Sequence, residues 1–367
     1  MSDDEDRDGE GNDIIVPAPR ANPAFAGHEA AEATLLAAFA SNRLPHGFLI
    51  TGPHGIGKAT LAFRFARFLL SQGSERGGLL APVAPTALEL SPQHPVFARV
   101  ASGGHADLLT VERGIDPKRK RVRSEIVVED ARAIAAFLRL TPAEGGWRIV
   151  IVDTADEMNR NAANAVLKIL EEPPERAILI LVSDNPGRLL PTIRSRCRRL
   201  ALRPLPAATV ATLIGAYRPD LSPADRADLV ELSEGSIGRA LEIAEHGGVA
   251  LHRGLEGLLN TLPELDGAAL HGFAEKVARW GNDDAFRMFA DLMPATLARA
   301  IVRAAEPSAT GSEKDAPFAK LLARRGLDRW VEVWEKIGHL FALADAVNLD
   351  RKQVVLNAFF ALEEAAR

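Results

Sequence analysis

Two near-continuous apolar runs constrain the fold of this chain more than any other feature. They are WRIVIVD (147–153), which ends in an acid, and AILILVS (177–183). Runs of this kind are typical of strands buried on both faces, as in a parallel sheet covered by helices. Helical patterns alternate with them, and NAANAVLKILEE (161–172) is one that two prolines end. The alternation predicts a three-layer α/β domain that extends to about residue 203.

A glycine-rich loop follows a third short strand, FLIT (48–51), and leads into a helix that begins at about Lys58. Gly52, Gly57 and Lys58 fill the phosphate-loop pattern G-x-x-x-x-G-K-[ST], and the strand–loop–helix context is the one that this motif requires. Backbone N–H groups at the helix N-terminus can cradle a phosphate, and the lysine adds a full charge. A plain turn between strand and helix is the alternative. The predicted nucleotide-binding residues of the loop are Gly52, Gly55, Ile56, Gly57, Lys58, Ala59 and Thr60.

Two groups that ATP hydrolysis needs are missing from the expected positions. The last loop position usually carries a hydroxyl that holds Mg²⁺, but here it is Ala59, and Thr60 comes one residue later. Asp153, at the end of its apolar strand, is the expected Mg²⁺ partner, unless it only caps the strand. A glutamate usually follows this acid and polarises the attacking water, whereas this chain has Thr154. The sequence therefore allows ATP with Mg²⁺ to bind but predicts absent or weak hydrolysis.

The composition narrows the class of protein. No apolar run reaches the ~20 residues of a membrane span, and a net charge of −5 does not favour a broad nucleic-acid-binding surface. Residues 1–19 open with MSDDEDRDGEGND, and this acidic segment predicts a disordered tail. The single cysteine, Cys197, excludes an intrachain disulfide and a multi-cysteine zinc site. These features predict a soluble, cytoplasmic protein without a metal site.

The remaining segments are expected to be irregular or helical. Residues 72–105 are rich in Gly, Pro and Ser without periodicity, which predicts an irregular excursion. Beyond residue 204 no strand pattern occurs, and a last helical region is broken by EPSATGSEKD (306–315). Helical patterns lie at 206–217, 223–233 and 236–246, and again from about residue 249 to the end.

The strongest basic cluster, Lys118, Arg119, Lys120 and Arg121, is expected on a loop after the strand DLLTVE (107–112). It is suited to contact a DNA backbone or an acidic partner surface, with salt-dependent affinity. No aromatic residue interleaves it, so base stacking is not indicated. A solvated loop without a partner is the other interpretation.

Three segments together resemble the clamp-loader branch of the AAA+ ATPases. They are LPHGFLITGPHGIGKATLA, IVIVDTADEMNRNAANAVLKILEEPP and LPTIRSRC, and the resemblance spans about residues 20–245. It implies an AAA+ P-loop α/β domain at 20–203, a small helical lid at 204–247 and an all-helical C-terminal collar domain for oligomerisation at 248–367. It also implies work within the replicative DNA polymerase III holoenzyme. The implied partners are ATPase motor subunits, a clamp-opening subunit, the sliding clamp and primed DNA.

The resemblance also gives Arg196 a role. In this family the Arg of an SRC motif reaches the ATP site of a neighbouring subunit as a trans-acting arginine finger, and Ser195-Arg196-Cys197 match that motif. A planar guanidinium is suited to bracket charge that develops on a γ-phosphate. Without the resemblance, RSRCRR would be interpreted as a solvated basic turn.

The sequence differs from that of an active family member at a further position, which again predicts absent or weak hydrolysis. The family's lid motif, GSxRxAL, carries an Arg that contacts the γ-phosphate in cis, and Gly238 stands at that position here. Arg239 lies ~100° further round the helix and is expected to face away. A polar sensor residue is expected within Val182–Asn185, although the sequence does not fix which one.

Many bacterial relatives carry a four-cysteine zinc module after the phosphate-loop helix. This chain has no cysteine between residues 71 and 106, which predicts no zinc. His94 and His105 are too few and too far apart to replace such a module.

The favoured function is a largely non-hydrolysing clamp-loader subunit whose Arg196 completes a neighbour's ATP site. The alternative is an autonomous AAA+ ATPase in which Thr60 and Asp156 replace the missing groups. A P-loop kinase of unrelated function is disfavoured by the LEEPP and SRC segments.

Overall fold

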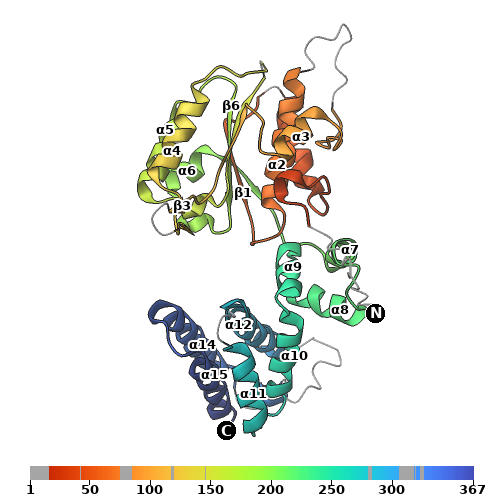
Figure 1. The fold of residues 1–367 in the computed structure, drawn as a ribbon, viewed down its shortest axis with the longest axis vertical. Coiled ribbons are helices and arrows are strands. Elements are labelled where there is room, and N and C mark those ends of the chain that lie inside the picture. Colours follow the sequence, from red (N-terminus) through yellow and green to blue (C-terminus); the bar gives the residue numbers. More distant parts are fainter. Residues whose placement is uncertain are drawn as a thin grey trace, which may run out of the picture. The chain divides into compact units, whose positions relative to one another are not determined.

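A computed structural model gives the fold of the chain as two compact units, one ending at Arg239 and the other beginning at Ala240 (Figure 1). It describes residues 16–41, 43–74, 85–116, 120–144, 146–279, 283–305, 318, 320–322 and 326–367. Of the acidic segment 1–19, residues 1–15 lie outside the described residues, and Pro19 begins a short 3-10 helix, η1 (Pro19–Ala21).

The first unit is built on a five-stranded parallel sheet with the strand order β2-β5-β6-β1-β7. The two apolar runs form β5 and β6, and every residue in both strands is buried. In the register between β1 and β6, Thr51 lies opposite Ser183, so the segments that follow these strands start side by side. The strands are β1 (Gly47–Thr51), β2 (Leu108–Val111), β5 (Arg148–Val152), β6 (Ala177–Ser183) and β7 (Arg198–Ala201).

Helices cover both faces of the sheet, with α2 and α3 on one side and α4, α5 and α6 on the other (Figure 1). Alternate residues of β6 enter the two cores: Ile178 and Ile180 join the core that contains α2, whereas Leu179 and Leu181 join the core that contains α5. The predicted three-layer α/β domain is confirmed. Its helices are α1 (Glu29–Ala40), α2 (Lys58–Ser74), α3 (Pro95–Ala101), α4 (Val128–Leu138), η2 (Ala155–Glu157), α5 (Arg160–Glu171), η3 (Pro186–Arg188) and α6 (Pro191–Arg196).

Three short elements differ from the sequence-based expectations. The stretch 72–105 is not wholly irregular, because α3 begins at Pro95, and His94 caps it by accepting a hydrogen bond from the Val96 N–H at 3.1 Å. The RSRCRR segment is not a turn, because it spans the end of α6 and the start of edge strand β7. Two-residue strands β3 (Ile115–Asp116) and β4 (Arg121–Val122) pair antiparallel where a loop was expected. Elements this short leave too few residues for a periodic signal.

The rest of the described chain is helical, as predicted. Phe289 lies at the centre of the second unit's core, with its ring centroid 5.6 Å from those of Phe273 and Phe341. The domain borders at 203/204 and 247/248 stay predictions, and 306–315 lies outside the described residues. The helices are α7 (Ala207–Tyr217), α8 (Pro223–Leu232), α9 (Ile237–Glu245), α10 (Gly248–Leu259), α11 (Gly267–Val277), α12 (Asp283–Ala305), α14 (Leu327–Val347) and α15 (Arg351–Ala366).

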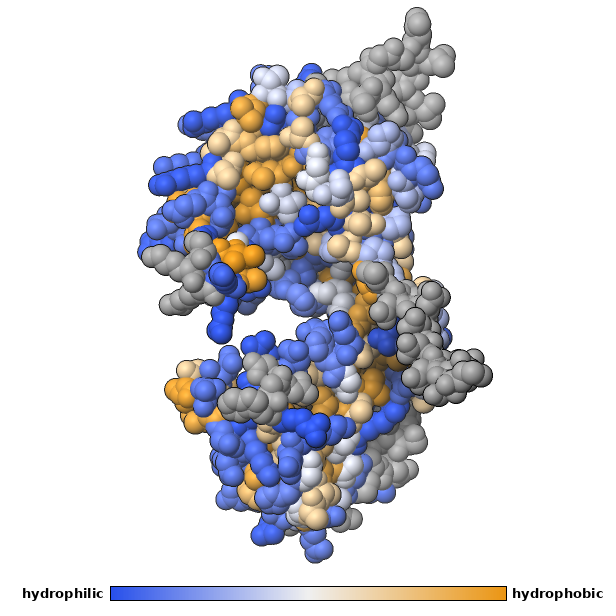
Figure 2. All heavy atoms as spheres, viewed as in Figure 1, coloured by the Kyte–Doolittle hydropathy of each residue, from blue (hydrophilic) through white to orange (hydrophobic). Residues whose placement is uncertain are grey.

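The surface is mostly polar. Hydrophilic residues make up most of the face seen in Figure 2, and hydrophobic residues show in smaller areas between them. Exposed large apolar side chains include Trp334, Leu343 and Val347 on α14. Among the helices that the structure describes, none combines the length and the hydropathy of a membrane span.

Candidate nucleotide site and arginine finger

The glycine-rich loop lies between the end of β1 and the start of α2. Gly52, Gly55 and Gly57 have φ values of 151°, 75° and 101°, which residues with a side chain rarely adopt. Contacts with the core hold the loop in place, because the Ile56 side chain is buried and its carbonyl oxygen lies 2.9 Å from Nε2 of His28. The chain therefore builds the backbone turn that a phosphate loop requires.

The lysine of this loop is already engaged by a carboxylate. Nζ of Lys58 lies 2.6 Å from Oδ1 of Asp184, and the Lys58 side chain is only 4% exposed. The ammonium also donates to the carbonyl oxygen of Pro53. The other oxygen of Asp184 lies 2.8 Å from Nδ1 of His54. Burial alone would raise the pKa of Asp184, but hydrogen bonds from His54 and Lys58 and the charge of Lys58 outweigh it, so the pKa lies below its usual value.

Asp153, at the end of β5, is half-buried beside other acids. Burial raises its pKa, and the charges of Glu112 and Asp184 act in the same direction. The next residue, Thr154, has a left-handed φ of 56°, and its hydroxyl donates to Glu157 at 2.7 Å. Glu157 also forms an ion pair with Arg113 at 2.8 Å, so its carboxylate is engaged by residues outside the glycine-rich loop.

Asp156 is a structural residue. Its two carboxylate oxygens accept the backbone N–H groups of Asp184 at 3.2 Å and Asn185 at 3.1 Å. The side chain is 9% exposed. Asp156 thus fixes the segment that carries Asp184 next to the loop, and both of its carboxylate oxygens are engaged there.

The start of helix α9 and the residue before it pack directly on the loop. The Ser236 hydroxyl donates to the carbonyl oxygen of His54 at 2.7 Å, and the Gly238 N–H donates to that of Gly55 at 2.8 Å. A Cβ added to Gly238 would lie 2.6 Å from Cα of Gly55, so this contact requires glycine. The Arg239 side chain lies 3.5 Å from Glu234.

Arg196 is the last residue of α6 and sits at the surface. The helix is anchored by Ile193 and followed by Cys197, both buried, and burial raises the pKa of the Cys197 thiol to about 11. The Arg196 side chain is 39% exposed. Its guanidinium lies 3.0 Å from Oε1 of Glu171 and donates to the Thr192 carbonyl oxygen at 3.1 Å. The group is therefore held in place and remains accessible to another chain.

Comparison with known proteins finds a family that the first unit resembles. Residues 27–206 match the family described as "DNA polymerase III, delta subunit". Over these residues the chain is similar to DNA polymerase III clamp-loader proteins. The structure confirms the predicted fold class as an α/β parallel-sheet domain followed by helices.

The clamp-loader relatives include proteins of two names. The chain is 35% identical over 192 residues to DNA polymerase III subunit delta′ of Pseudomonas aeruginosa, which covers 52% of this chain and 53% of the relative. It is 28% identical over 345 residues to DNA polymerase III subunit gamma/tau of Mycobacterium tuberculosis, covering 84% and 55%. The chain thus spans about half the length of these relatives. A solved gamma subunit-related protein of Thermotoga maritima is 21% identical with a TM-score of 0.36, covering 91% and 99%.

In the arrangement seen here, the loop does not fit ATP with Mg²⁺. The Lys58 ammonium pairs with a carboxylate, Ala59 offers no hydroxyl, and backbone of α9 lies on Gly55. Within the described residues, no group of three or more His, Cys, Asp or Glu side chains is placed to hold a metal ion. Nucleotide binding by the predicted residues, Gly52 to Thr60 and Asp153, stays a prediction.

We expect Asp156→Asn to weaken the first unit without changing ATP turnover by the chain. Asn replaces one of the two accepting oxygens with an NH₂ donor that would face a backbone N–H, so the free energy of unfolding should fall by about 2 kcal/mol. Urea unfolding and a coupled ATPase assay measure the two effects, with the exposed Asp220→Asn as control. If the wild type does turn over ATP and Asp156→Asn abolishes that turnover at unchanged stability, Asp156 is the water-activating acid of the alternative.

The structure describes only part of the predicted basic cluster. Lys118 and Arg119 lie outside the described residues. Lys120 has a φ of 51°, and Arg121 is exposed on β4. Contact of this cluster with DNA or a partner therefore stays a prediction.

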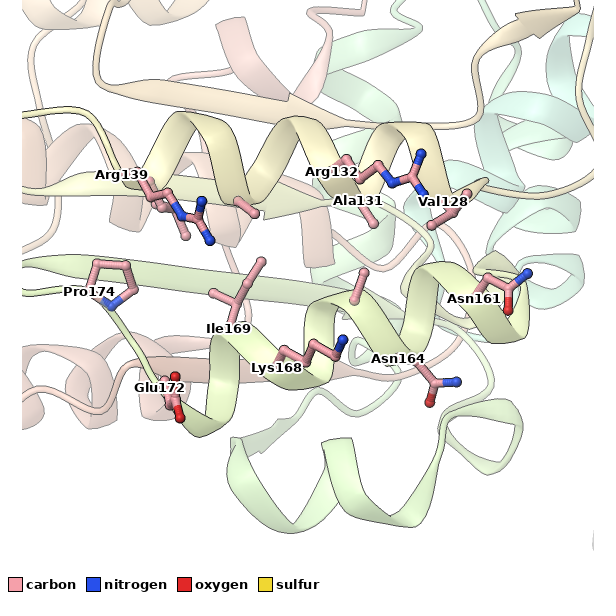
Figure 3. A pocket seen from close by; sticks show the side chains of 13 residues that line it. Val128, Ala131, Arg132, Arg139, Asn161, Asn164, Lys168, Ile169, Glu172 and Pro174 are labelled. Carbon is pink, nitrogen blue, oxygen red and sulfur yellow. The ribbon is translucent and has the colours of Figure 1, made fainter.

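A basic groove that the sequence did not reveal lies between α4 and α5. It encloses about 640 Å³. Figure 3 shows Arg132 on α4, Arg139 directly after the last residue of α4, and Lys168 on α5 along the groove, with Glu172 at one end. Arg132 and Arg139 are seven residues apart, a spacing that places both on one helix face. That spacing is the sequence signal that could have indicated a basic surface here.

Proposed function

We propose that the chain is a delta′-type subunit of a bacterial DNA polymerase III clamp loader and works in the cytoplasm. It would join ATPase motor subunits and a clamp-opening subunit in an assembly that loads the sliding clamp on primed DNA. The similarity to a relative named subunit delta′ supports this role. The cationic groove between α4 and α5 is suited to a nucleic-acid backbone and supports a DNA path along the first unit.

Within this assembly the chain would be a scaffold that hydrolyses no ATP of its own. The acids near the loop support this part of the proposal. Asp156 is bound to backbone N–H groups, and Glu157 is bound to Thr154 and Arg113. Both acids are engaged in these structural contacts, and Ala59 offers no hydroxyl for Mg²⁺.

The chain would instead contribute Arg196 to the ATP site of a neighbouring subunit. The observation that carries this proposal is the position of Arg196, anchored at the end of α6 yet 39% exposed. Its ion pair with the exposed Glu171 is weak in water, so a phosphate can compete for the guanidinium.

ATP turnover of the purified chain tests the scaffold proposal. We expect no turnover above background, with or without primed DNA, whereas the chain restores clamp loading when it is added to the other subunits. Turnover by the chain alone that Lys58→Ala abolishes would support the autonomous ATPase and overturn the scaffold. Failure of the chain to assemble with gamma/tau subunits would overturn the clamp-loader role itself.

A further inference from the structure

The glycine-rich loop of this chain already holds an anion, and that anion belongs to the chain. The carboxylate of Asp184 bridges two residues of the loop, with one oxygen 2.6 Å from Nζ of Lys58 and the other 2.8 Å from Nδ1 of His54. A phosphate group bound to this loop would interact with the same ammonium. The carboxylate and a phosphate therefore compete for one position.

We propose that Asp184 is a resident anion that occupies the phosphate position of this loop, so that a nucleotide can bind only after the carboxylate has left. This inference concerns the chain by itself and does not depend on the assembly in which the chain works.

The fold holds Asp184 where it blocks the loop. In the parallel register, Thr51 of β1 pairs with Ser183 of β6, so Gly52 and Asp184 are the next residues along two adjacent strands. Asp156 then accepts the backbone N–H groups of Asp184 and Asn185. The carboxylate is positioned by a strand and by a buried acid, and it does not depend on a mobile side chain reaching across the surface.

The start of α9 and the residue before it also contact the glycine-rich loop. Ser236 donates to the carbonyl oxygen of His54, and Gly238 donates to that of Gly55. These bonds hold the two loop residues that flank the occupied position, and His54 is itself a partner of Asp184. With Lys58 only 4% exposed, an incoming phosphate has no route to the ammonium while these contacts persist.

The apparent affinity for a nucleotide falls by the fraction of molecules in which the carboxylate has left. If this open form makes up about 1% of the population, the apparent dissociation constant is about 100-fold weaker than that of an open loop. Removing the negative charge at residue 184 should recover most of this factor. Asn is the matched replacement because it keeps the size of the side chain.

The test is ATP binding to the full chain, measured by calorimetry with and without Mg²⁺. We expect wild type to bind weakly or not at all and Asp184→Asn to bind about 100-fold more tightly. The gain should vanish in the double variant Lys58→Met/Asp184→Asn, because the ammonium is the group that the substitution releases. The exposed Asp220→Asn, which removes the same charge far along the chain, should behave as wild type.

Two results would overturn the proposal: wild type that binds ATP as tightly as Asp184→Asn, or a gain that persists in the double variant. If Asp184→Asn does not fold, His54→Ala decides the question. The His54 side chain is 76% exposed, so its loss is tolerated, and it removes one of the two partners of the carboxylate. A several-fold gain in ATP affinity is expected for His54→Ala, and an unchanged affinity would overturn the proposal.

Discussion

Replacing Arg196 with Ala should slow ATP hydrolysis at the neighbouring site of a reconstituted clamp loader by about 10³-fold to 10⁵-fold. A guanidinium that brackets charge developing on a transferred phosphoryl group acts mainly in the transition state. The loss should therefore appear in the rate of the chemical step, while nucleotide affinity changes little. Single-turnover hydrolysis of ATP by the assembly, with the Ala variant in place of this chain, measures it.

Two substitutions at the end of α6 distinguish an arginine finger from a nonspecific effect of positive charge. Arg194→Ala removes an exposed cation two residues earlier and should leave the rate unchanged. Arg196→Lys keeps the charge but loses the planar fork, so it should restore only part of the rate. Neither change should affect folding, because the pair with Glu171 is exposed on both sides and contributes little to stability.

The ion pair with Glu171 provides the decisive comparison. If Arg196 acts only within its own chain, Glu171→Gln should reproduce the phenotype of Arg196→Ala. If Arg196 works on a neighbour, Glu171→Gln should leave hydrolysis intact or increase it. A full hydrolysis rate in the Arg196→Ala assembly would end the case for a finger.

The sequence predicted those parts of the fold that burial dictates. β5 and β6 are buried on both faces, and such strands leave continuous apolar runs that no other element explains as well. The glycine-rich loop could also be predicted from the sequence, because its backbone needs glycine at defined positions. Edge strand β7 was missed because only Leu200 of its four residues is buried. The seven residues of α3 are too few to show helical periodicity.

The candidate site shows where sequence reasoning ends. The segment Val182–Asn185 was expected to carry a sensor residue, but only the pairing of β6 with β1 shows that Asp184 is the one that reaches Lys58. The role of Gly238 likewise depends on a contact with Gly55 across 183 residues of sequence. Such contacts follow from tertiary packing, which a single sequence does not encode in any local pattern. The role proposed for Arg196 came from the family resemblance, because arginines at the end of an exposed helix do not by themselves indicate a function.

Arg67→Ala should lower the free energy of unfolding of the first unit by about 3 kcal/mol. This is the largest loss of stability that we expect from replacing one buried arginine. Arg67 lies on α2 and is 2% exposed. Its guanidinium donates to the carbonyl oxygens of Arg20 and Asn22, both at 2.9 Å, and lies 4.4 Å from the ring centroid of Phe97. Burial, followed by the charge of Arg64, lowers its pKa to about 10, so it remains charged at neutral pH.

These contacts fasten the segment that precedes α1, which in turn carries His28 to the carbonyl oxygen of Ile56 in the glycine loop. Losing Arg67 should therefore loosen the loop as well as the helix. Urea unfolding measures the stability, and amide hydrogen exchange at the loop measures the loosening. Arg20→Ala is the matched control, because it keeps the backbone carbonyl and removes only an exposed pair with Glu112. If Arg67→Ala unfolds like this control, the buried guanidinium does not hold the N-terminal segment, and the loop does not depend on Arg67.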